Sequence, residues 1–221
     1  MVAAIDGPAG VGKSTVARRS AEAAGLLYVN SGSFYRAITF AVLEAGVPPA
    51  DPAAVLQTAR KCRLEMKGSC LTLNGRGVEN LIHSDAVDEW VAGHSSIPQV
   101  REIVNGRLRE IARGSNVLVE GRDIGTVVFP DADVKIFLDA DVATRAARRH
   151  AQGVSSLPLD QVERTISARD RVDQNKPTGR LQAAPDAVRI DTSHLTIDEV
   201  CDKVIEAILV KKNNPGDIRR I

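Results

Sequence analysis

The sequence lacks long apolar runs, closely spaced cysteines and a strong excess of charge, and each absence excludes a class of function. No apolar run reaches the length of a membrane-spanning helix. The three cysteines, Cys62, Cys70 and Cys201, show no CxxC spacing, so neither a disulfide framework nor a zinc site is indicated. The formal net charge is +1, so we expect no general affinity for a nucleic acid polymer or a membrane surface.

The remaining composition is that of an ordinary globular protein. Of the 221 residues, 43% are hydrophobic and 26% are charged, which favours one domain or one domain with an insert. We find no internal repeat, and the apolar start of the chain is typical of a core strand rather than a signal peptide. A cytoplasmic monomer is therefore the expected default.

The first fifteen residues carry the strongest motif. An apolar run ends at Asp6, and the next residues fit G-x-x-x-x-G-K-[ST] without a gap. The residues of this candidate phosphate-binding loop are Gly7, Pro8, Ala9, Gly10, Val11, Gly12, Lys13, Ser14 and Thr15. Its main-chain amides and the N-terminus of the following helix attract phosphate oxygens. Lys13 is expected to reach the β- and γ-phosphates of a nucleotide, and the Ser14 hydroxyl to bind Mg²⁺. The alternative is a glycine-rich turn with no ligand.

Strand and helix signals alternate along most of the chain. The expected strands cover residues 1–5, 26–29, 115–120, 133–138 and 187–190. The expected helices cover residues 16–24, 34–44, 51–61, 84–92, 98–113, 142–151, 159–173 and 196–210. This order predicts an α/β fold, a five-stranded parallel sheet flanked by helices, with ligands at the carboxyl ends of the strands. A polar tail, residues 211–221, is expected to fray.

Two turn signals between short alternating runs interrupt this pattern. Lys67-Gly68-Ser69 and Asn74-Gly75 predict a small antiparallel sheet, because Asn-Gly is a strong hairpin signal. We therefore expect a core made of residues 1–62 and 114–210, with residues 63–113 forming an insert and its flanking helices.

A group of basic residues lies near the predicted strand ends. Its members are Arg36, Arg101, Arg122, Arg145, Arg148, Arg149, Arg169 and Lys176. A second set of cations beside a phosphate-binding loop suggests a phosphoryl acceptor that is itself an anion, because guanidinium binds phosphate bidentately. For most of these residues taken singly, the alternative is a solvated surface charge. Arg122 is different, because Gly-Arg-Asp directly after an apolar strand places it at the ligand end of the sheet.

Several motifs together resemble those of bacterial cytidylate kinases, which have a P-loop NTPase-type fold. They are the loop from Gly7 to Thr15, Ser31-Gly32-x-x-Tyr35-Arg36, the run from Gly121 to Pro130 and Lys135-Ile136-Phe137-Leu138. The likeness extends from Val2 to about Val210. It implies transfer of the γ-phosphoryl group of MgATP to CMP or dCMP. It also implies that the insert binds the nucleoside monophosphate and that a helical lid, about residues 142–158, closes over ATP.

The resemblance also implies roles for individual residues. The positions that match the acceptor site are Ser31, Tyr35, Arg36, Arg101, Arg122, Asp123, Arg169, Asp173 and Lys176. Ser31 and Arg36 would hold the acceptor nucleotide, and Arg122 would bind phosphate. Arg101 and Asp123 would read the cytosine, whereas Arg169 and Asp173 would hold the sugar hydroxyls. The lid residues Arg145 and Arg149 are expected to shield the transferring group, so we interpret Lys13, Arg122, Arg145 and Arg149 as catalytic.

The sequence departs from the family pattern at positions that matter for the acceptor. Ala92 stands where the family has a base-contacting serine, so that contact is missing or supplied by Ser95 or Ser96. Lys176 replaces a phosphate-binding arginine, which keeps the charge but loses the bidentate fork and predicts looser acceptor binding. Arg180 is the alternative phosphate ligand.

Two other functions remain open from the residues alone. One is a kinase for another monophosphate or for a hydroxyl metabolite such as shikimate, with Asp123 as the base. The other is a P-loop switch that senses ATP without rapid turnover.

Overall fold

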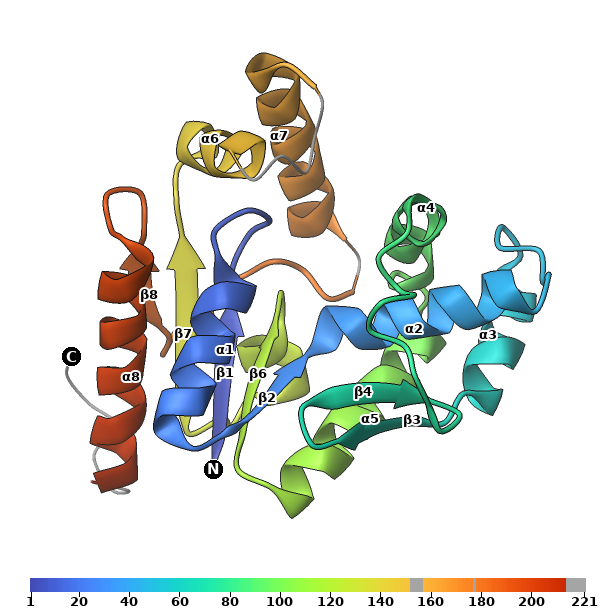
Figure 1. Ribbon diagram of the computed structural model, residues 1–221, viewed down its shortest axis with the longest axis horizontal. Coiled ribbons are helices and arrows are strands. Elements are labelled where there is room, and N and C mark those ends of the chain that lie inside the picture. Colours follow the sequence, from blue (N-terminus) through green and yellow to red (C-terminus); the bar gives the residue numbers. More distant parts are fainter. Residues whose placement is uncertain (152–156, 177, 214–221) are drawn as a thin grey trace. The chain divides into compact units, whose positions relative to one another are not determined.

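The computed structural model describes residues 1–151, 157–176 and 178–213, which form two compact units (Figure 1). The larger unit joins Met1–Tyr28 to Asn116–Ile221, and the smaller unit is Val29–Ser115. The predicted insert, residues 63–113, lies within the smaller unit, which also includes residues 29–62. Its role in binding the acceptor stays a prediction.

The larger unit is built around a parallel sheet. The strands are β1 (Val2–Asp6), β6 (Val117–Gly121), β7 (Val134–Asp139), β8 (Val188–Asp191) and β2 (Leu27–Asn30), in which the chain passes into the smaller unit after Tyr28. Within the described residues they lie in the order β2-β6-β1-β7-β8, so the predicted fold class and five-stranded sheet are confirmed. In the central strand, Asp6 is level with Gly121 of β6 and Phe137 of β7. The side chains that follow these three strands therefore start from one edge of the sheet.

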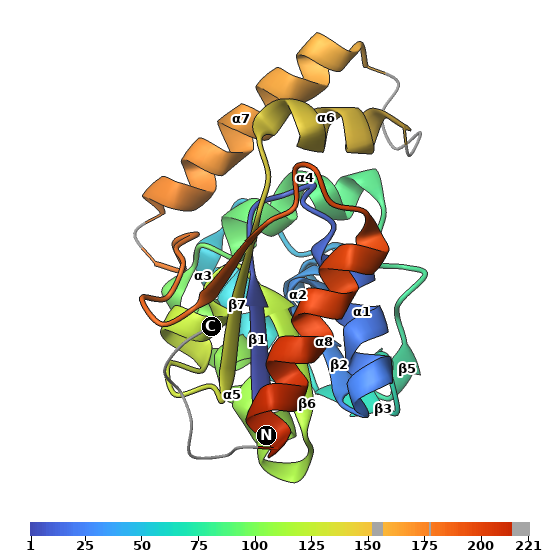
Figure 2. The same ribbon diagram turned by 90° about the vertical axis from the view of Figure 1, so that its left-hand side faces the viewer.

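The central strand is buried on both faces, as a parallel sheet requires. Ala3, Ala4 and Ile5 of β1 are fully buried. Two helices, α1 (Lys13–Ala24) and α8 (Ile197–Asn213), lie side by side over one face of the sheet (Figure 2). Their apolar side chains, Val16 and Val204 among them, form one core with the strands. This core fixes the start of α1, and with it the loop that follows β1.

Helices α6 (Val142–Ala151) and α7 (Leu159–Asn175) follow β7 and pack against each other (Figure 1). Their shared apolar contact is small, being made by Ala146, Val162 and Ile166 with Val142. The predicted lid, about residues 142–158, covers α6 and the connection to α7, of which residues 152–156 lie outside the described residues. Polar contacts, described below, hold these helices to the loop after β1.

The smaller unit combines helices with the expected small sheet. Its helices are α2 (Ser31–Glu44), α3 (Pro52–Lys61), α4 (Asp85–His94) and α5 (Pro98–Gly114). Its strands are β3 (Leu64–Lys67), β4 (Cys70–Leu73) and β5 (Arg76–Gly77), paired antiparallel in that order. Asn74 and Gly75, with φ of 52° and 84°, make the tight turn that Asn-Gly predicts.

Some helix ends differ from the prediction, and one turn was not predicted. Helix α2 begins at Ser31 rather than at residue 34, because the Asn30 side chain accepts the Ser33 N–H and caps the helix there. Helix α8 continues to Asn213, where the tail was expected to fray from residue 211, and Lys212 donates a 2.7 Å hydrogen bond to the Ala24 carbonyl. A π-helical turn at Ile124–Val128 was not predicted.

Residues 214–221 of the predicted tail lie outside the described residues. In the ranges that the structure covers, every helix is too short or too polar to span a membrane.

Candidate active site

The loop between β1 and α1 has the backbone that its glycines predict. Gly7 has a φ of 154°, and a Cβ built on it would lie 2.2 Å from the Leu138 carbonyl oxygen in β7. Only glycine fits so close to a neighbouring strand. Helix α1 begins at Lys13 with Gly12 as its N-cap, a residue that has no side chain to bond the first-turn amides. These amides are an anion-binding site at the positive end of the helix dipole.

Lys13 is buried at the start of α1. Its ammonium group donates a 2.6 Å hydrogen bond to the carbonyl of Pro8, near the start of the same loop. Burial lowers the pKa of Lys13 well below its usual value, and repulsion by Arg122 acts in the same direction. The carboxylates of Glu120 and Asp6 oppose this change. Negative phosphate groups beside Lys13 would raise its pKa again, so bound phosphate favours the charged ammonium form.

Ser14 connects the loop to the end of β6. Its hydroxyl donates a 2.8 Å hydrogen bond to Glu120 Oε1, and Glu120 is itself buried. A hydroxyl and a carboxylate are oxygen ligands of the kind that Mg²⁺ prefers. No cluster of three or more histidine, cysteine or acidic residues suited to a metal occurs among the described residues.

Asp6, the last residue of β1, binds the segment that follows β6. Its two carboxylate oxygens accept hydrogen bonds of 2.8 Å from the Ile124 and Gly125 main-chain N–H groups. Burial raises the pKa of Asp6 to about 6, although these two hydrogen bonds and Lys13 act in the opposite direction. The sequence alone indicates no role for Asp6. In the structure it positions the residues that directly follow Arg122 and Asp123.

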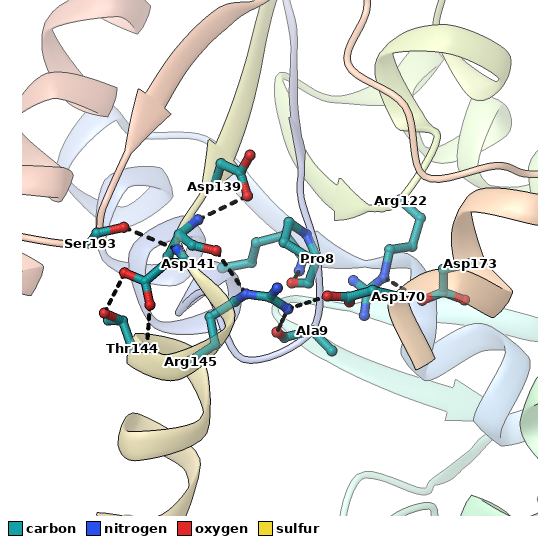
Figure 3. A network of polar contacts seen from close by, with 12 residues as sticks. Pro8, Ala9, Arg122, Asp139, Asp141, Thr144, Arg145, Asp170, Asp173 and Ser193 are labelled. Atoms are coloured by element: carbon teal, nitrogen blue, oxygen red, sulfur yellow. Dashed lines mark hydrogen bonds and ion pairs between the residues drawn. The ribbon is translucent and has the colours of Figure 1, made fainter. Parts of the chain in front are cut away.

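Arg122, Asp173 and Lys176 form one charged group in the larger unit. Arg122 Nε lies 3.2 Å from Asp173 Oδ2 (Figure 3). Lys176 Nζ lies 2.8 Å from Asp173 Oδ1. Burial alone would raise the pKa of Asp173, but its bonds to Lys176 and Arg122 outweigh burial and lower it. The two cations predicted to bind phosphate are therefore brought together and oriented by a single carboxylate.

The other predicted residues of the larger unit differ in their burial and their contacts. Asp123 is buried directly after Arg122. Arg169 is exposed on α7, and its charge helps to lower the pKa of Lys13. Arg149 is half-buried on α6. Arg148 bonds the Thr192 hydroxyl and carbonyl and so has a structural partner in the loop after β8.

Arg145 was predicted to be a catalytic side chain of the lid, and the structure shows where it lies. It is 4% exposed, and its guanidinium bonds the Ala140 and Ala9 carbonyls at 2.9 and 3.1 Å. It also forms a 2.6 Å ion pair with Asp170 of α7 (Figure 3). Asp170 belongs to no motif that is visible in the sequence.

The smaller unit contains its own basic group on α2 and α5. Arg36 donates a 3.1 Å hydrogen bond to the Ile82 carbonyl and is ion-paired with Asp88 of α4. The Arg101 guanidinium lies over the ring of Tyr35, with Cζ 5.6 Å from the ring centre, and both residues are buried. Ser31 is buried at the first turn of α2. The structure thus brings Tyr35 and Arg101 together from separate helices.

Ser95 and Ser96, the two candidates to replace the serine missing at position 92, have the same hydrogen-bond partner. Both Ser95 and Ser96 donate hydroxyl hydrogen bonds, of 3.0 and 2.9 Å, to the carbonyl of Ala92. Both hydroxyls therefore lie at the C-terminal end of α4. That one of them supplies the missing base contact stays a prediction.

The fold and the loop define an α/β protein with a P-loop, a phosphate-binding site at the carboxyl edge of a parallel sheet. A solved structure of an uncharacterized protein from Eubacterium ventriosum has a similar fold, with a TM-score of 0.51 at 13% identity, covering 94% of this chain and 98% of that one. The family model for cytidylate kinase matches residues 3–210. The chain therefore belongs to the cytidylate kinase family, a family of phosphotransferases.

Curated relatives agree with the family match. The cytidylate kinase of Geobacillus kaustophilus is 42% identical over 212 residues, covering 93% of this chain and 95% of that protein. The cytidylate kinase of Mycobacterium avium is 44% identical over 216 residues, covering 94% and 95%. This membership does not favour the alternatives, a kinase for another nucleotide or a hydroxyl metabolite and an ATP-sensing switch.

Proposed function

We propose that this protein transfers the γ-phosphoryl group of ATP to CMP or dCMP, giving ADP and CDP or dCDP. The observation that carries the proposal is the cytidylate kinase match over residues 3–210, which includes the P-loop and the Arg122 segment. An oxygen of the acceptor phosphate attacks the γ-phosphorus, and the bond to the bridging oxygen breaks, leaving ADP. No covalent enzyme intermediate is needed.

The donor site is proposed to be the loop from Gly7 to Thr15. Main-chain amides of the loop and of the first turn of α1 bind the phosphates. Lys13 exchanges its bond to the Pro8 carbonyl for the β- and γ-phosphates. Because Lys13 is buried, its interaction with phosphate is strong for a lysine.

The residues present fit a Mg²⁺ ion at the donor site. Ser14 and Glu120 already lie within hydrogen-bond distance of each other, and both offer oxygen ligands. Mg²⁺ bound there with ATP supplies neutralisation of the phosphate charge. Glu120 is proposed to hold the ion together with Ser14.

The acceptor nucleotide is proposed to bind the basic and polar groups identified above. In the smaller unit, Ser31 and Arg36 hold the nucleotide, and Arg101 next to Tyr35 reads the base. In the larger unit, Asp123 also reads the base and Arg169 with Asp173 holds the sugar. The acceptor phosphate is bound by Arg122 and Lys176, whose shared bond to Asp173 keeps them oriented.

Positioning and charge stabilisation account for the proposed catalysis. A nucleotide phosphate is already an anionic nucleophile near neutral pH, so no general base is required. Arg122 stabilises charge that develops on the transferring group, and Arg149 of α6 shields that group when the lid closes. Closure excludes water and so suppresses hydrolysis of ATP. We further propose that the protein acts as a cytoplasmic monomer.

An acceptor panel tests this function. Purified protein with Mg²⁺ and ATP is offered CMP, dCMP, UMP, AMP, GMP and shikimate, and ADP release is followed in a coupled assay. We expect CMP and dCMP to give rapid turnover. Turnover with shikimate alone would point to a hydroxyl acceptor, and slow release of ADP with every acceptor would point to a switch. Either result would exclude the proposed reaction.

A further inference from the structure

Arg145 is a meeting point of three segments of the larger unit. Its Nε atom donates to the Ala140 carbonyl after β7, and its terminal nitrogen donates to the Ala9 carbonyl in the P-loop. The same terminal nitrogen lies 2.6 Å from Asp170 Oδ2 on α7 (Figure 3). Arg145 is 4% exposed and Asp170 is 8% exposed. The contact therefore joins the P-loop to α6 and α7 in the interior of the protein.

The bond to Ala9 sets the direction of the next main-chain amide. In a planar trans peptide, the carbonyl of one residue and the N–H of the next point in opposite directions. Because Arg145 holds the Ala9 carbonyl, the Gly10 N–H is directed away from the guanidinium. Gly10 is one of the loop residues whose amides are proposed to donate to phosphate oxygens. Arg145 therefore orients one of these donors.

The packing of Gly10 reinforces this arrangement. Gly10 has a φ of 78°, and a Cβ built on it would lie 3.4 Å from both Cβ and the carbonyl oxygen of Arg145. The loop thus lies directly against the first turn of α6. A displacement of Arg145 would be transmitted to Gly10 through this contact as well as through the hydrogen bond.

The ion pair itself is not arranged for greatest stability. Within the described part of the chain, Asp170 Oδ1 is buried and has no hydrogen-bond partner. A buried ion pair with an unsatisfied oxygen contributes little net stability, because burial of its charges costs about as much as their attraction returns. Orientation of Arg145 is a better physical explanation for a buried carboxylate at position 170.

Helix α7 relates this contact to the acceptor side. Asp170 and Asp173 are three residues apart on α7, so they lie on neighbouring positions of one helical face. Asp170 holds Arg145, and Asp173 holds Arg122 and Lys176. One turn of α7 therefore orients cations that serve the P-loop and cations that are proposed to bind the acceptor phosphate.

We propose that Asp170 and Arg145 are positioning residues of the donor site. Asp170 fixes the Arg145 guanidinium, which in turn holds the Ala9 carbonyl and directs the Gly10 amide toward the phosphates of ATP. This inference rests on the proposed role of ATP as donor. It predicts that the pair sets the affinity for the donor nucleotide and has little effect on the affinity for the acceptor.

Calorimetric titration of each nucleotide alone tests the assignment. The non-hydrolysable analogue AMP-PNP with Mg²⁺, and separately CMP, are titrated into wild-type protein, Asp170→Asn and the control Asp160→Asn. Asp160 is an exposed carboxylate on the same helix, ion-paired with Arg164 at 3.5 Å, so its substitution removes the same charge. We expect Asp170→Asn to bind AMP-PNP about tenfold more weakly, as loss of one charge-assisted hydrogen bond implies, and CMP normally. Asp160→Asn should resemble the wild type for both.

A spectroscopic measurement separates orientation from a general loss of structure. In protein labelled with ¹⁵N-glycine, the Gly10 amide resonance should shift when AMP-PNP binds to the wild type and to Asp160→Asn. It should shift less in Asp170→Asn and recover in the conservative variant Asp170→Glu. If Asp170→Asn does not fold, Arg145→Lys, which keeps the charge but cannot reach all three oxygens, should give the same pattern.

Two results would overturn the proposal. One is normal affinity of Asp170→Asn or Arg145→Lys for AMP-PNP, and the other is equal weakening of AMP-PNP and CMP. Because AMP-PNP binding is measured without an acceptor, wild-type protein that binds AMP-PNP but leaves CMP unphosphorylated would refute the proposed function and not this assignment.

Discussion

The carboxylate of Asp6, at the end of the central strand, accepts a 2.8 Å hydrogen bond from the main-chain N–H of Gly125, 119 residues further along the chain. Its other oxygen accepts the N–H of Ile124 at 2.8 Å. The segment that carries Arg122 and Asp123 is therefore attached to the strand from which the P-loop starts. This attachment has a measurable consequence, because the carboxylate is only 4% exposed.

We predict that the contribution of Asp6 to stability falls as the pH rises from about 4 to 6. Burial raises its pKa from 3.8 to about 6, so in this range the folded protein keeps a proton that the unfolded chain has lost. The change amounts to roughly 3 kcal/mol. The free energy of unfolding of Asp6→Asn, measured by urea titration, should therefore improve relative to the wild type by that amount over this pH range.

The control for this measurement is Asp133→Asn. Asp133 also accepts a main-chain N–H, that of Val2 at 2.7 Å, but it is exposed. Asp133→Asn therefore removes a carboxylate that accepts a main-chain N–H without removing a buried one. A constant difference between Asp6→Asn and the wild type across this pH range would contradict the prediction.

Arg122→Ala should impair use of the acceptor far more than use of the donor. The substitution removes a proposed phosphate ligand and leaves the Asp173 carboxylate with Lys176 as its remaining ion-pair partner among the described residues. Loss of a charge-assisted hydrogen bond predicts a fall of about 10- to 100-fold in kcat/KM for CMP. The KM for ATP should change little. Arg164→Ala, on the exposed face of α7, is the matched control, and normal turnover of CMP by Arg122→Ala would remove this residue from the mechanism.

The P-loop could be predicted from the sequence because its geometry depends on residue types that are visible there. The left-handed or crowded positions require glycine, and Lys13 and Ser14 follow at a fixed spacing. The parallel sheet could be predicted for a similar reason, since apolar strands alternate with amphipathic helices. Helix ends could be predicted less accurately than the sheet. The start of α2 at Ser31, for example, depends on one hydrogen bond of the Asn30 side chain.

The contacts made by Asp6, Arg145 and Asp170 could not be predicted in this way. The sequence pattern places Asp6 at the end of a strand. It would be the same if Asp6 did not bind the main-chain amides 118 and 119 residues further along the chain. Arg145 lies in an arginine-rich helix, where neither composition nor spacing tells which guanidinium is buried. Its 4% exposure results from the packing of α6 and α7, a tertiary feature with no local pattern.

Gly7→Ala and Gly106→Ala should have opposite effects on stability. A Cβ on Gly7 would lie 2.2 Å from the Leu138 carbonyl oxygen, a main-chain atom that cannot move without disturbing β7. We expect a loss of about 3 kcal/mol or more. Gly106 is exposed in α5, and a Cβ there meets no heavy atom within 4 Å in the described structure, so alanine should stabilise the protein by about 0.5–1 kcal/mol. Chemical denaturation measures both, and a Gly7→Ala variant as stable as the wild type would contradict the strand contact.

The acceptor phosphate should depend on Lys176 and not on Arg180. The Lys176 ammonium lies 2.8 Å from Asp173 Oδ1, beside Arg122, and its side chain is 14% exposed. Arg180 is exposed, and its Nε donates to the Lys176 carbonyl at 2.8 Å. Lys176→Ala should therefore raise the KM for CMP about tenfold, and Arg180→Ala should leave it within about twofold.

Lys176→Arg provides the sharper test, because it adds the hydrogen-bond donors that a lysine lacks. A guanidinium can keep a bond to Asp173 and present further donors to phosphate, whereas an ammonium is a point charge. The KM for CMP should fall about threefold in this variant, measured at saturating ATP, because one added hydrogen bond to phosphate strengthens binding by about that factor. An unchanged KM in Lys176→Arg together with a raised KM in Arg180→Ala would assign the phosphate to Arg180, because only a residue in contact with the acceptor responds to the loss of its charge in this way.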